Sequence, residues 1–524
     1  MHTQHFPDLE LRKLNTLILA YCNANPSIRH LYNFEPSMAD LVAYASQREF
    51  SDEAYDVLSD ALINQYSGYL PIEAVNENLA AFKSRSAITV TTGHQLCLLG
   101  GPAFMICKIL SAIKLAQTVQ ANFAHKQVVP VFWLASEDHD REEIDHTFVH
   151  GKRLQWNTTQ TGAVGRFATD GFAEVLEEWL AEIQDESFRH TMTALWNRAS
   201  QFASWAQLTK SWVHECFGEW GLVVINPDDA RLKRLFLPHM HVELLQQKTH
   251  KAVTTTNADL LQMGFQAQVN PREINLFYLA DGSRLRIERK DETWQTTDQL
   301  RVWSEDQLID ALDAHPENFS PNVLLRPLYQ ETILPNIAYV GGPGEVAYWL
   351  QLRSMFQEFQ TVMPVVILRN SLVVLSSVVG KRMVKLGLNA ADLFKPKELL
   401  IAQLVGDKPD FSEEKKELEQ VYERLANRIA SVDPTLRATA MAELQRVQTG
   451  IDQLQGKAWK AAKNREEQKL ATLDKVWEEV YPNGQWQERT QNMLSLALAN
   501  DKELMRMLLN EFAAPNSTMV VVEC

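Results

Sequence analysis

The chain has 524 residues, of which 45% are hydrophobic and 22% charged. These are globular values, and the length allows roughly two to four domains. The formal net charge is −15, whereas nucleic-acid-binding proteins usually present a basic surface, so no nucleic-acid partner is expected. The five cysteines form no CxxC pair, which argues against a disulfide framework and a structural zinc site.

The N-terminus and the apolar runs favour a cytoplasmic protein. The first residues lack a basic region followed by an apolar stretch, so no signal peptide is predicted. The longest apolar runs, such as residues 363–368, are far shorter than the ~20 residues of a membrane span. Unpaired cysteines fit a reducing compartment. We therefore expect neither export nor a membrane partner.

Apolar runs of strand length predict a buried parallel sheet. They lie at residues 87–92, 128–135, 221–227 and 364–369. Residues 103–119, between the first two runs, carry apolar residues at helical spacing, which makes a βαβ unit. Near-continuous apolar runs are typical of a parallel sheet covered on both faces. The predicted fold class is therefore α/β.

Composition divides the rest of the chain around this core. Insertions are expected near residues 145–215 and 268–305, and the second contains Asp281-Gly282 between alternating runs, a strong hairpin signal. The predicted domains are an N-terminal helical region that packs on the core (1–85), the core (86–390), a helical arm (391–480) and a C-terminal segment that returns to the core (481–524).

Residues 411–480 predict an antiparallel helical hairpin. They are rich in Glu, Lys, Gln, Leu and Ala, and Asp433-Pro434 interrupts them. Apolar residues recur at spacings of 3 and 4 in two series, the first of which is Leu418, Val421, Leu425 and Ile429. Two helices bury little of their own surface. We therefore favour a homodimer through this coiled-coil arm over an arm that packs back on the core.

Three polar segments follow strand-like runs and carry the predicted chemistry. They are the segments 91–95 (TTGHQ), 136–140 (SEDHD) and 341–345 (GGPGE). In open α/β sheets, ligands bind outside the carboxyl ends of the strands. We therefore expect the three segments to converge on one cleft.

The first two segments suggest anion binding and proton transfer. Residues 91–94 fit the T-x-G-H form of nucleotidyl transferases related to class I aminoacyl-tRNA synthetases, in which the histidine neutralises phosphate charge. The alternative for His94 is a tight turn with a satisfied histidine. Asp138 or His139 is a candidate to position or deprotonate an amine. Side chains at a strand end alternate in direction, so no metal site is predicted here.

The third segment suggests a second anion site. Gly341, Gly342 and Gly344 permit positive φ and a close backbone approach, and a helix beginning near Glu345 would offer free N–H groups to a carboxylate or phosphate. Arg326, upstream, is a candidate anion clamp. The structural alternative is a tight strand-to-helix turn.

Taken together, these motifs resemble the bacillithiol biosynthesis cysteine-adding enzymes. Segments similar to that family's signatures follow one another in its order and at matching spacing. They begin with Thr92-Gly93-His94-Gln95, continue through Pro130–Asp140 and Leu325–Trp349, and end near Pro482–Arg489. The resemblance covers about residues 90–490 and is far more specific than any one motif.

The resemblance implies a Rossmann-like core, a dimerising coiled-coil arm and an amide-forming ligase. The implied reaction is the last step of bacillithiol synthesis, in which the carboxyl group of cysteine is joined to the amine of glucosaminyl-malate. The expected catalytic residues are Asp138, His139 and His94. The expected substrate-binding residues are Gly93, Gln95, Arg326, Tyr339, Gly341, Gly342, Gly344 and Glu345.

The activating cofactor stays open at this point, between ATP and another nucleotide. The family suggests a nucleotide site near the arm, for which the candidates are Asn483, Gly484, Glu488 and Arg489; their structural alternative is a capped turn with a surface ion pair. Three other functions stay open as well. They are a nucleotidyl transferase without the cysteine step, a coiled-coil dimer that binds a metabolite without catalysis, and a metal-dependent hydrolase that uses the segment from Glu137 to His146.

Overall fold

The computed structural model describes residues 2–7, 14–149, 151–183, 185–280, 282–492 and 503–523. The chain forms two compact units. The larger unit is built from Thr3–Val373 and Gln485–Val522, and the smaller one mainly from Val374–Gly484. Each is described by itself below.

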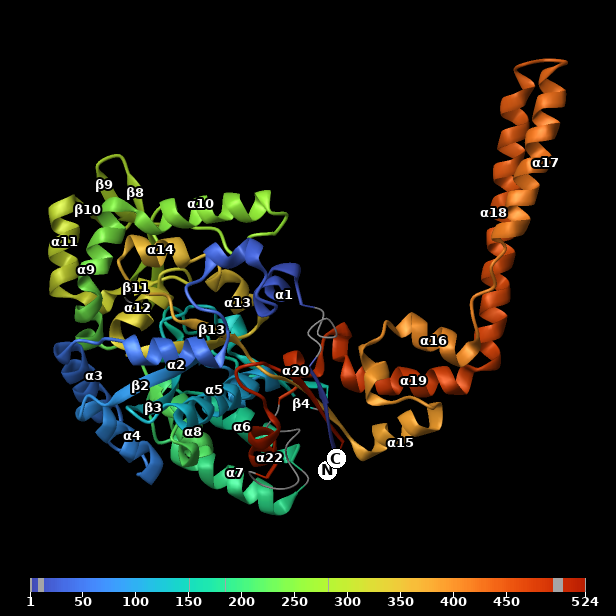
Figure 1. Cartoon of the computed structure of the whole chain (residues 1–524). Helices are drawn as coiled ribbons and strands as arrows, with labels where there is room; N and C mark the ends of the chain where they lie inside the picture. The colour runs from blue at the N-terminus through green and yellow to red at the C-terminus, as the bar shows by residue number, and fades with distance from the viewer. Residues whose placement is uncertain are drawn as a thin grey trace. The chain divides into compact units, whose positions relative to one another are not determined.

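A five-stranded parallel sheet forms the centre of the larger unit (Figure 1). Its order is β13-β12-β2-β3-β6, and every neighbouring pair is parallel. The strands are β2 (Ala87–His94), β3 (Gln127–Leu134), β6 (Val223–Ile225), β12 (Asn336–Gly341) and β13 (Val365–Leu368). The four predicted strands are thus present, and the α/β fold class is confirmed.

The strand order reverses beside β2. From β2 the chain adds β3 and then β6 on one side, and later adds β12 and β13 on the other. This order is that of a Rossmann-like sheet, and its switch point lies between β2 and β12. Ligands bind at such a point, outside the carboxyl ends of the strands.

Alternating side chains bury both faces of the sheet. Ile88 and Val90 of β2 pack with α2 (Met38–Gln47) and α5 (Ala103–Asn122) on one face. Val129, Val131 and Trp133 of β3 belong to the core on the other face, with α3 (Asp52–Gln65), α9 (Ala230–Gln246) and α13 (Pro343–Trp349). The two sets of side chains lie on opposite faces because successive strand residues alternate in direction. Trp133 lies near the carboxyl end of β3 and lines the cavity described below.

Helix α5 is the central covering helix. Among the helices that the structure describes, it is the one long and apolar enough to cross a membrane by length and composition. However, 72% of its apolar window is buried inside the protein, where it packs on the sheet. Its composition therefore follows from its place in the core.

Smaller sheets and further helices complete the larger unit. An antiparallel sheet has the order β10-β9-β8-β7-β11. Its strands β7 (Leu276–Ala280) and β8 (Ser283–Lys290) form the predicted hairpin, in which Ala280 is opposite Ser283; Asp281 of the turn lies outside the described residues. The other strands of this sheet are β9 (Thr293–Thr296), β10 (Val302–Trp303) and β11 (Phe319–Pro321).

The first predicted insertion contains both strands and helices. The pair β4 (His146–Val149) and β5 (Lys152–Gln155) is antiparallel, and α6 (Phe172–Ala181), α7 (Glu186–Ala199) and α8 (Trp205–Phe217) follow it. A three-stranded sheet has the order β1 (His2–Phe6), β15 (Met519–Glu523) and β14 (Ser371–Leu375). Other helices of the unit are α1 (Thr16–Cys22), α4 (Glu73–Lys83), α10 (Lys248–Gln262), α11 (Glu305–Ala314), α12 (Arg326–Ile333), α14 (Arg353–Glu358), α20 (Gln487–Thr490) and α22 (Glu503–Glu511).

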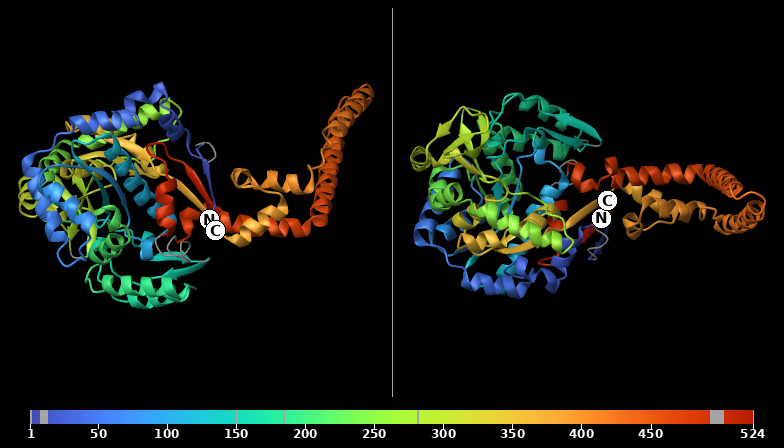
Figure 2. Two further views of the ribbon diagram at one scale, coloured as in Figure 1. Left: turned by 60° about the horizontal axis from the view of Figure 1, so that its bottom comes forward. Right: turned by 90° about the horizontal axis from the view of Figure 1, so that it is seen from above.

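The smaller unit is helical. It contains α15 (Ser377–Leu386), α16 (Lys397–Val405), α17 (Ser412–Ala430), α18 (Leu436–Arg465) and α19 (Glu467–Val480). Helices α17 and α18 lie side by side in Figures 1 and 2 and are joined by the turn predicted at Asp433-Pro434, so the helical hairpin is confirmed.

The hairpin buries few of its own apolar residues. Ala426, Ala440 and Leu444 are buried between its helices. In contrast, 39% of Val421, 43% of Leu425 and 37% of Ile429 stay exposed, although these residues belong to the predicted apolar series. More than half of each of these residues is covered, and the apolar surface that stays exposed forms a stripe along α17.

Candidate active site

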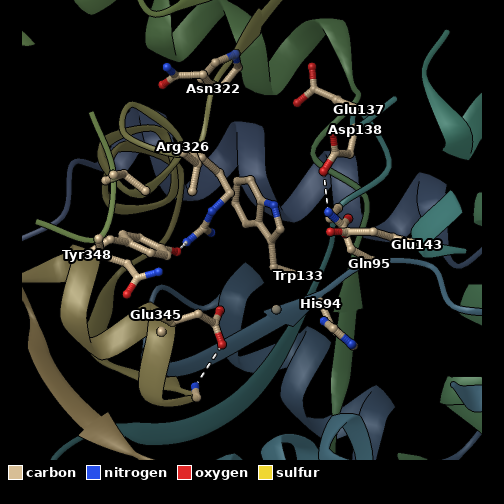
Figure 3. A pocket seen from close by; sticks show the side chains of 18 of the residues that line it. His94, Gln95, Trp133, Glu137, Asp138, Glu143, Asn322, Arg326, Glu345 and Tyr348 are labelled. Atoms are coloured by element: carbon tan, nitrogen blue, oxygen red, sulfur yellow. Dashed lines mark hydrogen bonds between the residues drawn. The ribbon is translucent and has the colours of Figure 1, made fainter. Parts of the chain in front are cut away.

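One large cavity lies in the larger unit, at the switch point of the sheet. Its volume is about 680 Å³, and it opens beyond the carboxyl ends of β2, β3 and β12. All three polar segments contribute to its lining (Figure 3). The residues from these segments are Gly93, His94, Gln95, Glu137, Asp138, Gly342, Pro343, Gly344 and Glu345.

The end of β2 is fixed by a buried lysine from α5. Lys108 is 2% exposed, and its Nζ donates to the carbonyl oxygen of Gly93 and lies 2.6 Å from Oε2 of Glu345. A Cβ on Gly93 would lie 3.1 Å from the Cβ and carbonyl oxygen of Trp133, so glycine allows the two strand ends to pack closely. Lys108 thus ties the tip of β2 to the segment that follows β12.

Glu345 is held by donors from the protein itself. Its Oε1 accepts from the hydroxyl of Tyr339 at 2.5 Å, and its Oε2 accepts from the N–H of Gly342 at 2.8 Å. Burial favours the neutral carboxyl, but Lys108 outweighs it and holds the pKa of Glu345 below its usual value. Glu345 and Tyr339 both line the cavity. Their polar atoms are already engaged by contacts within the protein.

The glycine-rich segment differs from its predicted geometry. Helix α13 begins at Pro343, which has no N–H, and the N–H of Gly342 is taken by Glu345. Among Gly341, Gly342 and Gly344 none adopts positive φ. A Cβ on Gly341 would lie 3.0 Å from that of Glu345. Close packing at Gly341, and not a left-handed turn, is what requires glycine there.

His94 is not arranged as a phosphate-neutralising cation. Burial, and then the charges of Lys108 and Arg369, lower the pKa of His94 to about 3. The ring is therefore neutral near pH 7. Its Nε2 lies 3.7 Å from the Sγ of Cys97, and its ring centroid lies 4.9 Å from that of Phe104. This environment speaks against a positively charged ring, and a role of His94 at a phosphate stays a prediction.

Asp138 is an anion surrounded by donors. It accepts from Nε2 of Gln95, from Nη1 of Arg284 at 3.2 Å and from the backbone N–H of His139 at 2.8 Å. Burial raises its pKa, but hydrogen bonds from His139, the charge of Arg284 and the bond from Gln95 outweigh burial and hold the pKa well below the usual range. Asp138 is thus ionised at neutral pH and a weak base.

His139 projects toward Arg284. Its Nδ1 lies 3.0 Å from Nη1 of Arg284, and about half of its side chain is exposed. The same Nδ1 lies 3.4 Å from Oδ1 of Asp138, so it accepts from Arg284 when it is unprotonated and donates to Asp138 when it is protonated. In both states Nδ1 is engaged by a neighbouring side chain of the protein.

Glu137 is buried in an ion pair. Lys233 of α9 contacts Oε1 of Glu137 and also donates to the carbonyl oxygen of Phe319 at 2.6 Å. Within the described ranges, no group of three or more His, Cys, Asp or Glu side chains is arranged to hold a metal ion. The carboxylates after β3 are instead neutralised by Lys233 and Arg284.

Arg326 offers a guanidinium to the cavity from the first turn of α12. Its Nη1 donates to Oε1 of Gln330 at 3.1 Å, and its Nη2 lies 3.4 Å from the hydroxyl of Tyr348. The guanidinium carbon lies 5.7 Å from the centre of the Trp133 ring. Among the residues that the structure describes, no carboxylate lies within ion-pair distance of Arg326. Within those residues, the charge of Glu345 acts on Arg326 without a direct ion pair.

The predicted nucleotide residues fall in different places. Asn483 and Gly484 are exposed, with φ of 54° and 76°, and belong to the smaller unit. In the larger unit, Glu488 is buried and pairs with Arg369 at 2.8 Å, whereas Arg489 is exposed and lines the cavity. A nucleotide contact from Glu488 would require its pair with Arg369 to open. The nucleotide site stays a prediction.

Sequence reasoning missed several side chains that shape the cavity. Arg284 lies on β8, next to the hairpin turn, and Glu143 lies in a short helical turn after the second polar segment. A lysine among apolar residues in the first turns of α5 was a signal for Lys108. No local signal marks Arg284, because only the packing of the antiparallel sheet brings it to Asp138.

Fold and site together define an α/β protein with a polar ligand cavity at a Rossmann switch point, followed by a helical hairpin. Two family models match the chain. Residues 3–370 match the N-terminal Rossmann-like domain of bacillithiol biosynthesis BshC, and residues 372–524 match its C-terminal coiled-coil domain. The chain therefore belongs to the BshC family of bacillithiol biosynthesis.

Curated relatives agree with this assignment. A protein of Cytophaga hutchinsonii is 35% identical over 507 residues, which cover 95% of this chain and 94% of the relative. A protein of Flavobacterium psychrophilum is 33% identical over 515 residues, or 97% of both chains. A third, from Salinibacter ruber, is 31% identical over 513 residues, covering 93% and 92%. Each is named "Putative cysteine ligase BshC". These names support a ligase.

Proposed function

We propose that this protein joins the carboxyl group of cysteine to the amine of glucosaminyl-malate, the final step of bacillithiol synthesis, and that the cavity at the switch point is its active site. One observation carries the proposal: Arg326 faces the cavity and has no carboxylate partner among the described residues, so it is available to a carboxylate of the substrate. The names of the relatives point to cysteine, and the family resemblance points to glucosaminyl-malate.

The size and the walls of the cavity suit two small polar substrates. Its volume of about 680 Å³ is in the range of small-molecule sites. The guanidinium carbon of Arg326 lies 5.7 Å from the ring centre of Trp133 and 5.2 Å from that of Tyr339, so both rings are within cation–π distance. A guanidinium can form two parallel hydrogen bonds to one carboxylate. Asp138 and Glu143 supply negative charge elsewhere on the wall.

The cysteine carboxylate is a poor electrophile and has to be activated before the amine attacks. ATP or another nucleotide would supply an acyl adenylate or an acyl phosphate. We retain Asn483, Gly484, Glu488 and Arg489 as candidates for the nucleotide site. Backbone N–H groups beside Gly93 are candidates to hold the anionic oxygen.

Homodimerisation through α17 and α18 is part of this proposal, as is a cytoplasmic location. The exposed stripe of Val421, Leu425 and Ile429 supports a dimer, because apolar residues at these spacings are buried when a second pair of helices covers them. The described cysteines, Cys22, Cys97, Cys107 and Cys216, carry thiols and no disulfide, which fits a reducing compartment.

Incubation of the full chain with cysteine, glucosaminyl-malate and each of several nucleotides, followed by mass spectrometry, tests the reaction. The expected product has the mass of the two substrates less one water, and Arg326→Gln should suppress it. A nucleotide adduct of glucosaminyl-malate that forms without cysteine would favour a nucleotidyl transferase. Binding of both substrates without product, with any nucleotide or with host extract, would favour a metabolite-binding protein.

A further inference from the structure

Charged side chains line the cavity on both sides of Trp133. Asp138 pairs with Arg284 and Glu345 pairs with Lys108, whereas Arg326 and Glu143 have no ion-pair partner among the described residues. In Figure 3, Arg326 and Tyr348 lie on one side of Trp133, while Gln95, Asp138 and Glu143 lie on the other. Substrates that carry both carboxylate and amine groups are oriented by the charges of Arg326 and Glu143, because each end is attracted to one of them. The carboxylate belongs beside Arg326, which leaves the amine for the second region, that of Gln95, Asp138 and Glu143.

Within the second region, Asp138 is an unsuitable proton acceptor. Its carboxylate already accepts from Gln95, Arg284 and the backbone of His139. An amine that approached it would compete with these donors. The contacts do have another effect, since the bond from Nε2 of Gln95 to Asp138 fixes the orientation of the Gln95 amide.

Gln95 therefore presents an unused acceptor. With Nε2 bonded to Asp138, the other end of the amide is Oε1, which is buried and has no hydrogen-bond partner in the part of the chain that the structure describes. A buried acceptor without a donor is costly, on the order of 1–3 kcal/mol. A ligand N–H that bonds to Oε1 would remove this cost.

Glu143 lies next to this acceptor. It ends the helical turn Arg141–Glu143, lines the same cavity, and is close enough to Gln95 for the amide to stabilise its charged form. Glu143 is exposed at the cavity, like its neighbour Glu142, but partial loss of solvent, and then the charges of Asp140 and Asp138, raise the pKa of Glu143 above its ordinary value. Among the described residues, no Lys, Arg or His lies within ion-pair distance of its carboxylate. Arg284 and His139, which lie nearby, contact Asp138 instead.

We infer that Gln95 and Glu143 form the subsite for the acceptor amine, in which Oε1 of Gln95 accepts one N–H and the carboxylate of Glu143 takes one proton. The ammonium R–NH₃⁺ and the carboxylate become R–NH₂ and a neutral carboxyl, and the freed lone pair of the nitrogen faces the activated acyl group. Asp138 acts as a positioning residue that orients Gln95. This inference rests on the proposed function and moves the base from Asp138 or His139 to Glu143.

The dependence of kcat/KM on pH tests the base. The wild-type rate should rise with pH through an apparent pKa above that of an ordinary glutamate. Glu143→Gln should lose about 100-fold or more and also lose this limb of the profile. Glu142→Gln, which changes the neighbouring exposed residue outside the cavity lining, is the matched control and should keep both. A Glu143→Gln enzyme with an unchanged rate and profile would overturn the inference.

A binding measurement is independent of turnover. Calorimetry compares glucosaminyl-malate with its N-acetyl derivative, which lacks the basic amine. The wild-type chain should prefer the amine at least 10-fold, and Gln95→Leu or Glu143→Gln should lose the preference. Equal affinities in the wild type would overturn the subsite. If the chain prefers the amine but forms no product, the proposed function alone is contradicted. If product forms and Glu143→Gln leaves its formation unchanged, this inference alone is contradicted.

Discussion

Arg326 and Asp138 show how neighbouring residues decide what a charged side chain does. Both line the same cavity. Asp138 is surrounded by donors from Gln95, Arg284 and His139, whereas Arg326 contacts neutral partners at Gln330 and Tyr348. Because no carboxylate among the described residues forms an ion pair with it, Arg326 is the residue whose loss should affect substrate affinity most directly.

Replacement of Arg326 by glutamine should weaken glucosaminyl-malate binding by about 10- to 100-fold, the usual loss for a hydrogen bond to a charged group. Calorimetry on the full chain measures it. Arg153→Gln, at an exposed position outside the cavity lining, is the control and should bind normally. Unchanged affinity in Arg326→Gln would show that the substrate carboxylate binds elsewhere.

Glu331 predicts a dependence of stability on pH. Burial raises its pKa from 4.5 to about 7. The folded chain then holds this proton more tightly than the unfolded chain. The contribution of Glu331 to the free energy of unfolding is therefore greatest below about pH 4.5 and is lost as the pH rises to about 7. The total loss is on the order of 3 kcal/mol.

Glu331→Gln removes this titration, because an amide takes up no proton in this range. Urea unfolding measures the free energy of unfolding of both proteins at pH 5 and pH 8. The difference between the variant and the wild type should change in favour of the variant at pH 8, by on the order of 2–3 kcal/mol. A stability difference that is the same at both pH values would mean that Glu331 titrates normally in the folded chain.

At the scale of elements, the cavity depends on a connection between β2 and α13. Lys108 of α5 contacts both the carbonyl of Gly93 and the carboxylate of Glu345. Lys108→Met should destabilise the larger unit by about 3–5 kcal/mol, because it leaves a buried carboxylate without its cation. Urea unfolding of the single and double variants measures this loss.

The double variant Lys108→Met/Glu345→Gln should recover part of that stability, since the carboxylate is then absent. Glu345→Gln alone is the companion measurement that completes the cycle. If the double variant were as unstable as the sum of the two single variants, the ion pair would have no coupling energy and this interpretation would be wrong.

Local sequence predicted much of the sheet but little of the side-chain contacts in the cavity. The β-branched run of residues 87–92 marked a buried strand, and the polar segments marked the strand ends. The contacts of Arg284 and Lys108 come from other elements, β8 and α5, so they depend on how those elements pack. The low pKa of His94 likewise arises from burial and from the distant Lys108 and Arg369, which no local motif contains.

At the scale of the whole molecule, the exposed apolar stripe of α17 predicts self-association. A variant with both Leu425→Glu and Ile429→Glu should be monomeric in analytical ultracentrifugation, whereas the wild type should be a dimer. Gln420→Glu, at an exposed polar position of the same helix, adds charge without removing apolar surface and should stay dimeric. A wild-type monomer, or a dimer that persists in the double variant, would contradict the dimer.

The central claim is that the cavity at the switch point between β2 and β12 holds the substrates. A crystal structure of the full chain with glucosaminyl-malate tests it most directly. We predict that a malate carboxylate contacts Arg326 and that the sugar amine lies near Oε1 of Gln95 and the carboxylate of Glu143. Glucosaminyl-malate bound at another place, with this cavity empty at a saturating concentration, would contradict the claim.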